Sequence, residues 1–179
     1  MQIESLPIIL ALGANLDSRL GAPGQTLRAV EVDLDRAGIR VSARSRLYVS
    51  PPDPPPDPPG SQPDYINAAV TVETGLGPAD LLARLHEIEA AHGRLRTVRN
   101  APRPLDLDIV DYRGLVRNGG QDGAPAAPVL PHPRAHLRAF VLLPLAEILP
   151  DWRHPVSGRS IADLIAALPP DAATAVPLG

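Results

Sequence analysis

The sequence contains no cysteine and no lysine, and each absence excludes a class of protein. Without cysteine there are no disulfides, thiolate zinc sites or cysteine nucleophiles. All 17 basic residues are arginine, so the chain has neither the lysine of a Walker A phosphate loop nor the amine of a Schiff-base enzyme. It also lacks an apolar run near the roughly 18 residues that a membrane span needs, and no export signal is visible. We therefore expect a cytoplasmic protein with no membrane partner.

Neither sign of charge dominates the sequence. The net charge is only −3 and there is no basic tail, which disfavours a general nucleic-acid binder. A local arginine cluster could still hold a small anion. With 179 residues, 44% of them hydrophobic, the chain is long enough for one domain with a sizeable core. We therefore predict a single domain over residues 1–179.

Hydrophobic periodicity predicts an alternation of strands and helices. Apolar runs or period-two patterns indicate strands over residues 7–12, 39–49, 64–74 and 102–110. Apolar residues at helical spacing indicate helices over residues 27–37, 78–92, 134–149 and 161–168. The order strand, helix, strand, strand, helix, strand is the split β-α-β arrangement. It predicts an α+β fold with an open antiparallel sheet and helices packed on one face.

Two segments are predicted to be loops. Residues 51–59 read PPDPPPDPP, which cannot donate enough backbone hydrogen bonds to join a sheet or helix and should extend as polyproline II. This proline-rich loop is either an inert surface insertion or a segment whose flanks line a site. Residues 113–128 are rich in glycine and alanine, which predicts a flexible loop.

The stretch PRPLDLDIV at residues 102–110 places two carboxylates in an otherwise apolar strand. Because side chains alternate along a strand, Asp106 and Asp108 point to the same side, about 7 Å apart along the backbone. Two like charges on one face repel, and aspartate is poorly suited to strands. The pair therefore indicates either an exposed polar face on an edge strand or a shared divalent cation.

An arginine-rich segment directly precedes this acidic pair. Residues 94–103 carry Arg94, Arg96, Arg99 and Arg103 without an acidic residue. A guanidinium donates paired hydrogen bonds to phosphate, and magnesium binds to one or two carboxylates together with substrate phosphates. These cations beside two carboxylates favour the metal interpretation, with a nucleoside triphosphate as the natural ligand.

Other polar residues leave two interpretations open. His132 and His136 are four residues apart and could ligate a metal if helical, although such a pair more often packs or lies at the surface. Tyr65 and Asn67 share a strand face, which suits either ordinary edge exposure or a stacking ring beside an amide that reads a heterocycle.

Several motifs together resemble a known family. They are LGANL at 12–16, LYVSPP at 47–52, QPDYINAAV at 62–70, PRPLDLDIV at 102–110 and LPHPRAHLRAFVLLPLAEI at 130–148. Over about residues 8–168 the chain is similar to the 6-hydroxymethyl-7,8-dihydropterin pyrophosphokinases (HPPK) of folate biosynthesis. The resemblance implies a ferredoxin-like α+β fold, a mainly antiparallel sheet with helices packed on it and mobile catalytic loops. It also implies transfer of pyrophosphate from ATP to the pterin hydroxymethyl oxygen, releasing AMP.

The resemblance also implies roles for individual residues. Asp106 and Asp108 would hold two Mg²⁺ ions, and the expected catalytic arginines are Arg94, Arg96 and Arg103. The residues expected to bind ATP are His86, Glu89, Arg96, Arg103, Ile109 through its backbone, His132 and Arg138. The residues expected to bind the pterin are Gly13 in a tight turn, Ser50, Pro51, Tyr65, Asn67 and Phe140.

Two departures from the family pattern qualify the expected function. Asp53 stands where the family often has a leucine near the pterin, and Asn100 and Ala101 replace its usual Trp-Gly pair.

We expect a monomer whose partners are the pterin and ATP. The alternatives are a related nucleotide-dependent transferase with another acceptor, or an interaction module that presents the proline-rich loop to an aromatic groove.

Overall fold

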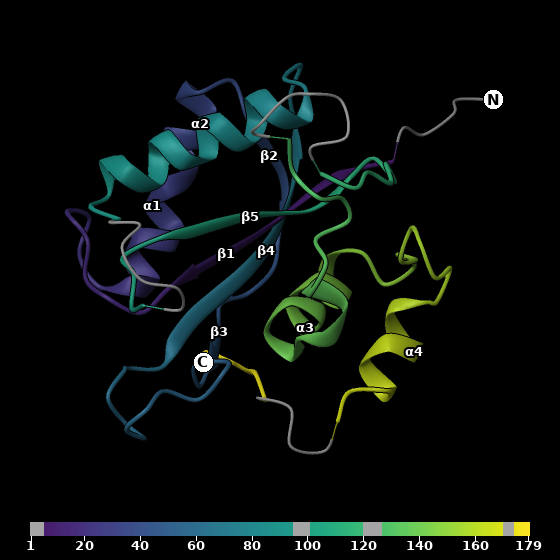
Figure 1. Cartoon of the computed structure of the whole chain (residues 1–179). Coiled ribbons are helices and arrows are strands. Elements are labelled where there is room, and N and C mark those ends of the chain that lie inside the picture. Colours follow the sequence, from purple (N-terminus) through teal and green to yellow (C-terminus); the bar gives the residue numbers. More distant parts are fainter. Residues whose placement is uncertain (1–5, 95–100, 120–126, 170–173) are drawn as a thin grey trace.

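An antiparallel sheet forms the centre of the protein (Figure 1). The computed structural model describes residues 6–94, 101–119, 127–169 and 174–179. Within them the strands are β1 (Ile8–Ala14), β2 (Arg40–Arg44), β3 (Tyr48–Ser50), β4 (Tyr65–Glu73), β5 (Asp106–Tyr112) and β6 (Val176–Pro177). Their order is β5-β1-β4-β3-β6, and β2 also pairs with β4. The predicted α+β class with an antiparallel sheet is confirmed.

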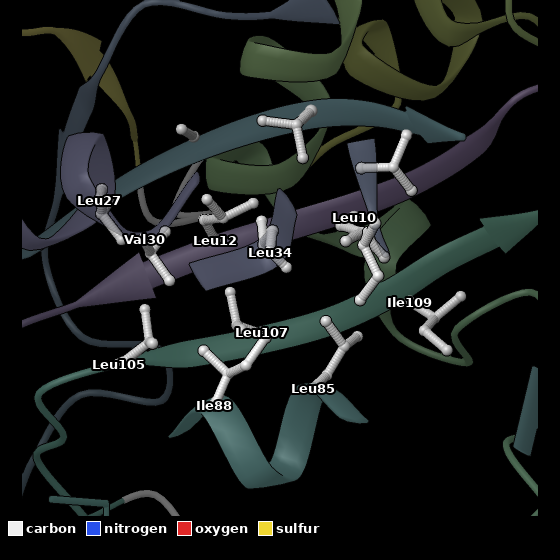
Figure 2. Packing of buried hydrophobic residues seen from close by; sticks show 14 of the residues in the cluster. Leu10, Leu12, Leu27, Val30, Leu34, Leu85, Ile88, Leu105, Leu107 and Ile109 are labelled. Atoms are coloured by element: carbon white, nitrogen blue, oxygen red, sulfur yellow. The ribbon is translucent and has the colours of Figure 1, made fainter. Parts of the chain in front are cut away.

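Helices α1 (Pro23–Arg36) and α2 (Pro78–Ala91) cover one face of this sheet. Figure 2 shows leucine, valine and isoleucine side chains from both helices meeting those of β1 and β5. Helix α2 begins as predicted, with Gly77 at the N-cap and Pro78 at the first helical position, where its missing N–H costs nothing. Gly38, with φ of +76°, follows the end of α1, where a left-handed residue commonly stops a helix.

Helices α3 (Ala139–Ile148) and α4 (Ile161–Ala166) pack on the opposite face, so the prediction that helices cover only one face is wrong (Figure 1). A 3₁₀ turn, Ala135–Leu137, precedes α3. Because α3 covers β4, every residue of β4 from Asn67 to Val72 is buried despite the period-two pattern. No helix in the described part of the chain is long and apolar enough to cross a membrane.

The segment 39–49, predicted as one strand, forms two. Strand β2 ends at Arg44 and β3 begins at Tyr48. Between them the Ser45 hydroxyl accepts the backbone N–H of Ala69 at 3.0 Å, a bond that a continuous strand would make with its backbone. The alternation shifts across this break, so Tyr48 and Ser50 are buried while Val49 is only half-buried. The alternation in the sequence places Val41, Ala43 and Val49 on one inward face. This face is the less exposed one in β2, but in β3 the opposite face is the buried one.

Strand β5 carries the acidic pair on the face that α3 covers. Leu105, Leu107 and Ile109 enter the core formed with α1 and α2 (Figure 2). Asp106 and Asp108 alternate with them and stay half-buried, as the sequence predicts. In the described part of the chain β5 pairs only with β1, so its other edge is free to meet side chains from elsewhere. This edge becomes important at the site.

A second core under α3 and α4 contains a buried histidine. Trp152 Nε1 donates to Asp111 Oδ2 at 2.9 Å, the Trp152 ring meets the His154 ring edge-on, and the His136 ring centroid lies 4.7 Å from that of His154. Burial lowers the pKa of His154, and the neighbouring His136 lowers it further. His136 therefore packs against His154. This contact favours the packing interpretation over a metal site shared with His132.

The fold should lose stability in mild acid because of this histidine. An unfolded chain protonates His154 near its usual pKa of about 6.5, whereas the folded chain resists protonation, so folding is favoured above that pH and weakened as pH falls below it. We expect the urea midpoint of the native protein to fall more between pH 7.5 and 5 than that of His154→Gln. Parallel curves for the two proteins would contradict this role.

Candidate active site

The two aspartates of β5 line a cavity on the α3 side of the sheet. Asp106 accepts hydrogen bonds from the guanidinium groups of Arg94 and Arg103, the latter at 3.2 Å from Arg103 Nη1 to Asp106 Oδ2. The prediction that Asp106 and Asp108 share one face is confirmed. Both carboxylates are therefore presented to the same space, but Arg94 and Arg103 form ion pairs only with the first.

Asp108 is the less well compensated member of the pair. Among the described residues it makes no ion pair. Burial raises its pKa to about 7, and the negative charges of Asp106 and Glu89 add to the effect. The charges of Arg94 and Arg138 act on it in the opposite direction and lower its pKa. A desolvated carboxylate beside two others favours a cation. No three His, Cys, Asp or Glu side chains in the described ranges are grouped to hold a metal, so a cation here needs further ligands from a substrate.

Arg94 joins helix α2 to the acidic pair. It contacts both Glu89, on the last turn of α2, and Asp106. Glu89 is 1% exposed, and its Oε1 accepts the Leu107 backbone N–H at 2.8 Å, at the free edge of β5. Glu89 thus satisfies an unpaired strand group and orients Arg94. The predicted residues Arg96 and Arg99, with Asn100, lie outside the described residues.

Asn15, which the sequence reasoning did not single out, positions Arg103. Its Oδ1 accepts the Arg103 backbone N–H at 2.8 Å, and its own backbone N–H donates to the Arg103 carbonyl at 3.0 Å. Its Nδ2 donates to the Pro63 carbonyl at 3.2 Å. An asparagine directly after an apolar run, in the motif LGANL, is the sequence signal that could have found it, and the residue is only 2% exposed in the structure. Burial disfavours a charged Arg103, but Asp106 and Tyr65 outweigh burial and raise the Arg103 pKa.

The same cavity has an aromatic and amide-lined part. Asn67 Nδ2 donates to the Ser50 hydroxyl at 2.9 Å, and both residues are buried. Tyr65 and Phe140 also line the cavity, with Pro51 at its wall. Burial raises the pKa of Tyr65, so the phenol stays neutral at ordinary pH. The structure therefore brings five of the six predicted pterin residues together as side chains around one space, and the sixth is Gly13.

Gly13 lies inside β1 and not in the predicted tight turn. It pairs with Asn67 of β4 on one side and Asp106 of β5 on the other. A Cβ atom at this position would lie 3.4 Å from Asn67 Oδ1 and 3.8 Å from both Asp106 Cβ and Tyr65 Cδ1. Strand β1 runs further than predicted because its pairing with both neighbours continues to the end of the apolar run. The missing side chain opens space between the amide and the acidic pair.

Arg138 and His132 complete the cavity. The Arg138 guanidinium carbon lies 5.3 Å from the centroid of the Phe140 ring, a cation–π contact. Burial lowers the pKa of Arg138, and the like charge of Arg134 lowers it further. Burial, followed by the charge of Arg138, also lowers the pKa of His132, whose Nδ1 accepts the Arg134 backbone N–H at 3.2 Å. His132 is therefore a neutral group here.

Three of the residues predicted to bind ATP lie outside the cavity lining. His86 and Glu89 lie on α2, and the side chain of Ile109 is buried in the core between α2 and the sheet. Ile109 can meet a ligand only through its backbone, as predicted. The cavity lining described above includes none of these side chains. They flank the free edge of β5, and Arg94 reaches around that edge from Glu89 to Asp106.

The proline-rich loop lines the cavity with its first residues. Pro51, Pro52, Asp53 and Pro54 all contribute to the wall. The flank of the loop therefore lines this cavity, which favours the interpretation of a segment that lines a site over that of an inert insertion. Asp53 also contacts two arginines of the cavity rim, a contact that the sequence pattern did not predict.

An antiparallel α+β fold that presents paired carboxylates, arginines and an aromatic-lined cavity defines the chain as a phosphoryl-transferring enzyme. Within that class, the chain belongs to the 7,8-dihydro-6-hydroxymethylpterin-pyrophosphokinase (HPPK) family, whose sequence model matches residues 9–150.

Curated relatives agree with this membership. The 2-amino-4-hydroxy-6-hydroxymethyldihydropteridine pyrophosphokinase of Synechocystis sp. is 42% identical over 161 residues, which cover 88% of this chain and 73% of the relative. The enzyme of the same name from Pseudomonas aeruginosa is 37% identical over 163 residues, covering 90% of this chain and 91% of the relative. The mitochondrial folate synthesis bifunctional protein of Arabidopsis thaliana is 39% identical over 142 residues, but these cover only 23% of it.

Solved structures share the fold. Wild-type Plasmodium falciparum HPPK-DHPS aligns with a TM-score of 0.63 at 14% identity, covering 92% of this chain and 42% of that chain. An HPPK-DHPS structure in complex with substrates gives a TM-score of 0.66 at 13% identity, covering 91% and 43%. This chain therefore spans less than half the length of those two-part proteins.

Proposed function

We propose that this chain transfers pyrophosphate from ATP to 6-hydroxymethyl-7,8-dihydropterin in folate biosynthesis, in the cavity beside β5. The observation that carries the proposal is the position of Asp106 and Asp108. They lie between the arginines of the cavity and its aromatic, amide-lined part. In the reaction a bond forms between the pterin hydroxymethyl oxygen and the β-phosphorus of ATP. The bond from that phosphorus to the oxygen shared with the α-phosphate breaks, and AMP leaves.

The pterin fits the aromatic part of the cavity. The chain has only one phenylalanine, three tyrosines and one tryptophan, yet two of these five rings line this one space. Phe140 and Tyr65 offer faces or edges for stacking on a flat bicyclic ring. Asn67 has its Nδ2 engaged by Ser50, so its orientation is fixed and its Oδ1 accepts hydrogen bonds from the amino edge of the heterocycle.

The triphosphate fits the charged part. Arg103 and Arg94 are directed toward the carboxylates by Asn15 and Glu89, so their remaining N–H groups are positioned before a ligand arrives. Guanidinium groups donate to phosphoryl oxygens and balance their charge during transfer. Holding the hydroxymethyl group beside the β-phosphorus supplies the orientation that a two-substrate reaction needs. Because a walled cavity excludes water, ATP hydrolysis competes poorly with transfer.

The donor set suits magnesium. Asp108 is a half-buried, desolvated carboxylate without an ion-pair partner among the described residues, and with Asp106 it offers hard oxygen ligands on one face. We propose that Asp106 and Asp108 hold two Mg²⁺ ions, the remaining ligands coming from the phosphates. Bound there, magnesium neutralises phosphoryl oxygens and acidifies the accepting hydroxyl, so no strong side-chain base is needed.

The proposal is tested by product analysis of the purified chain with ATP, magnesium and the reduced hydroxymethylpterin. We expect AMP and the pterin diphosphate in equal amounts, and neither product when the pterin or the magnesium is omitted. A related reduced pterin without the hydroxymethyl group is the matched control, because it fills the same pocket but offers no acceptor oxygen. AMP release that is independent of the pterin, or no AMP at all, would contradict the proposal.

A further inference from the structure

Asp53 lies at the rim of the cavity, on the proline-rich loop between β3 and β4. Its Oδ2 is 3.4 Å from Arg138 Nε and 4.0 Å from Arg134 Nη2. The side chain of Asp53 is 33% exposed and that of Arg138 only 15%. One half-exposed carboxylate is therefore placed between two guanidinium groups.

This carboxylate satisfies the two arginines incompletely. Within the described part of the chain, Arg138 Nε is buried and makes no hydrogen bond of good geometry, although Asp53 Oδ2 is close. Arg134 and Arg138 are near enough to repel each other, and Arg138 also lies over the Phe140 ring. Among the described residues, Asp53 is the only carboxylate within ion-pair distance of Arg138. The two aspartates of β5 act on Arg138 from farther away, and its Nε keeps a free donor. An anion of higher charge would satisfy both arginines better.

The contact also bridges a gap in the molecule. A cleft lies between the proline-rich loop and the start of α3, lined by Pro55, Pro56 and Gly60 on one side and by Leu137, Ala139 and Phe140 on the other. Asp53 supplies ion pairs across this cleft. Asp53 is preceded by Pro52 and followed by Pro54 and Pro55. Because proline has no backbone N–H to donate, the Asp53 carboxylate provides a polar contact that the neighbouring backbone cannot make.

We propose that Asp53 is an internal anion that occupies the Arg134–Arg138 site and is displaced by a phosphate group of the bound nucleotide. The inference builds on the proposed function, which supplies the polyphosphate. Asp53 therefore sets how strongly the site binds ATP, because every anion must first replace it. Its release also detaches the proline-rich loop from the start of α3.

The direct test is calorimetric titration with tripolyphosphate, without divalent metal, which probes the arginine site independently of catalysis. Removing the competing charge in Asp53→Asn is expected to tighten binding about threefold to tenfold, as for a partly exposed ion pair. Asp53→Glu should restore affinity to within about twofold of the native protein. Asp57→Asn removes an exposed charge from the same loop and is expected to leave binding unchanged.

Two further readouts separate competition from a purely structural role. The KM for ATP should fall in Asp53→Asn by the same factor as the tripolyphosphate constant. Amide exchange at residues 60–62 should rise when tripolyphosphate binds to the native protein and should already be high in Asp53→Asn. Unchanged or weaker anion binding in Asp53→Asn, or equal tightening in Asp57→Asn, would overturn the inference. Loss of pterin-dependent AMP formation in the native protein would overturn only the proposed function.

Discussion

Asp108→Asn is expected to lower kcat for AMP formation by about a thousandfold, a loss of several kcal/mol in transition-state stabilisation. The substitution keeps the size and hydrogen-bonding outline of the side chain but removes a charge that makes no ion pair with any described residue. Because Asp106 already shares its charge with Arg94 and Arg103, it cannot take over the role. The measurement is steady-state AMP formation at saturating ATP, pterin and magnesium.

The same substitution should stabilise the protein when no metal is present. Asp108 is desolvated and repelled by Asp106 and Glu89, so a neutral amide removes an unfavourable interaction from the folded state. In EDTA at pH 8, we expect the free energy of unfolding of Asp108→Asn to exceed that of the native protein by about 1–3 kcal/mol. A gain in stability together with a loss of activity is typical of a residue kept for function.

The matched control is Asp111→Asn, three residues along the same strand. Asp111 accepts N–H groups from Trp152 and, at 2.8 Å, from Gly114, and it lies away from the cavity lining. We expect that variant to unfold more easily and to keep its activity, the opposite of Asp108→Asn. Near-native turnover in Asp108→Asn would contradict the metal assignment, and so would a kcat loss of similar size in Asp111→Asn.

Local sequence patterns are enough to predict most helices and strands and the shared face of Asp106 and Asp108. The alternation of Leu105, Leu107 and Ile109 with two aspartates depends only on strand geometry, and it holds in the fold. The start of α2 at Pro78 and the capping of α4 by Ser160, whose hydroxyl accepts the Asp163 N–H at 3.1 Å, are equally local. Such features depend on neighbours within a few residues, and the sequence displays those directly.

Features that depend on distant contacts were missed. Nothing near β4 indicates that α3 will cover its second face, because the residues responsible lie some 70 positions later. In the same way, Asn15 reaches Arg103 across 88 positions, and Asp53 meets Arg138 from a distant part of the sequence. The family resemblance implies a tight turn at Gly13, yet pairing with two strands extends β1 through it. Long-range pairing prevailed over local preference at each of these positions.

Gly13→Val is expected to weaken pterin binding about a hundredfold while leaving the fold as stable as before. A Cβ at residue 13 is only in ordinary contact with Asn67 Oδ1, but the two γ-methyl groups of valine extend into the space bordered by Tyr65 and Asp106. Overfilling such a space costs about 1–3 kcal/mol, which corresponds to about a fivefold to 150-fold loss of affinity. Gly13→Ala, which adds the Cβ alone, should lie near the lower end of that range.

The free energy of unfolding of both variants is expected to rise slightly or to stay unchanged. Glycine within a strand costs about 0.5–1 kcal/mol relative to alanine, and β-branched residues favour strands, so neither variant has a reason to unfold. Pterin fluorescence titration gives the affinity, thermal unfolding reports the fold, and tripolyphosphate titration serves as the internal control. The anion should bind both variants as it binds the native protein, because the atoms nearest to the added Cβ belong to Asn67, Asp106 and Tyr65 and not to Arg134 or Arg138. Native-like pterin affinity in Gly13→Val would show that the ring lies elsewhere, whereas parallel loss of pterin and anion binding would point to a distorted sheet instead of a filled pocket.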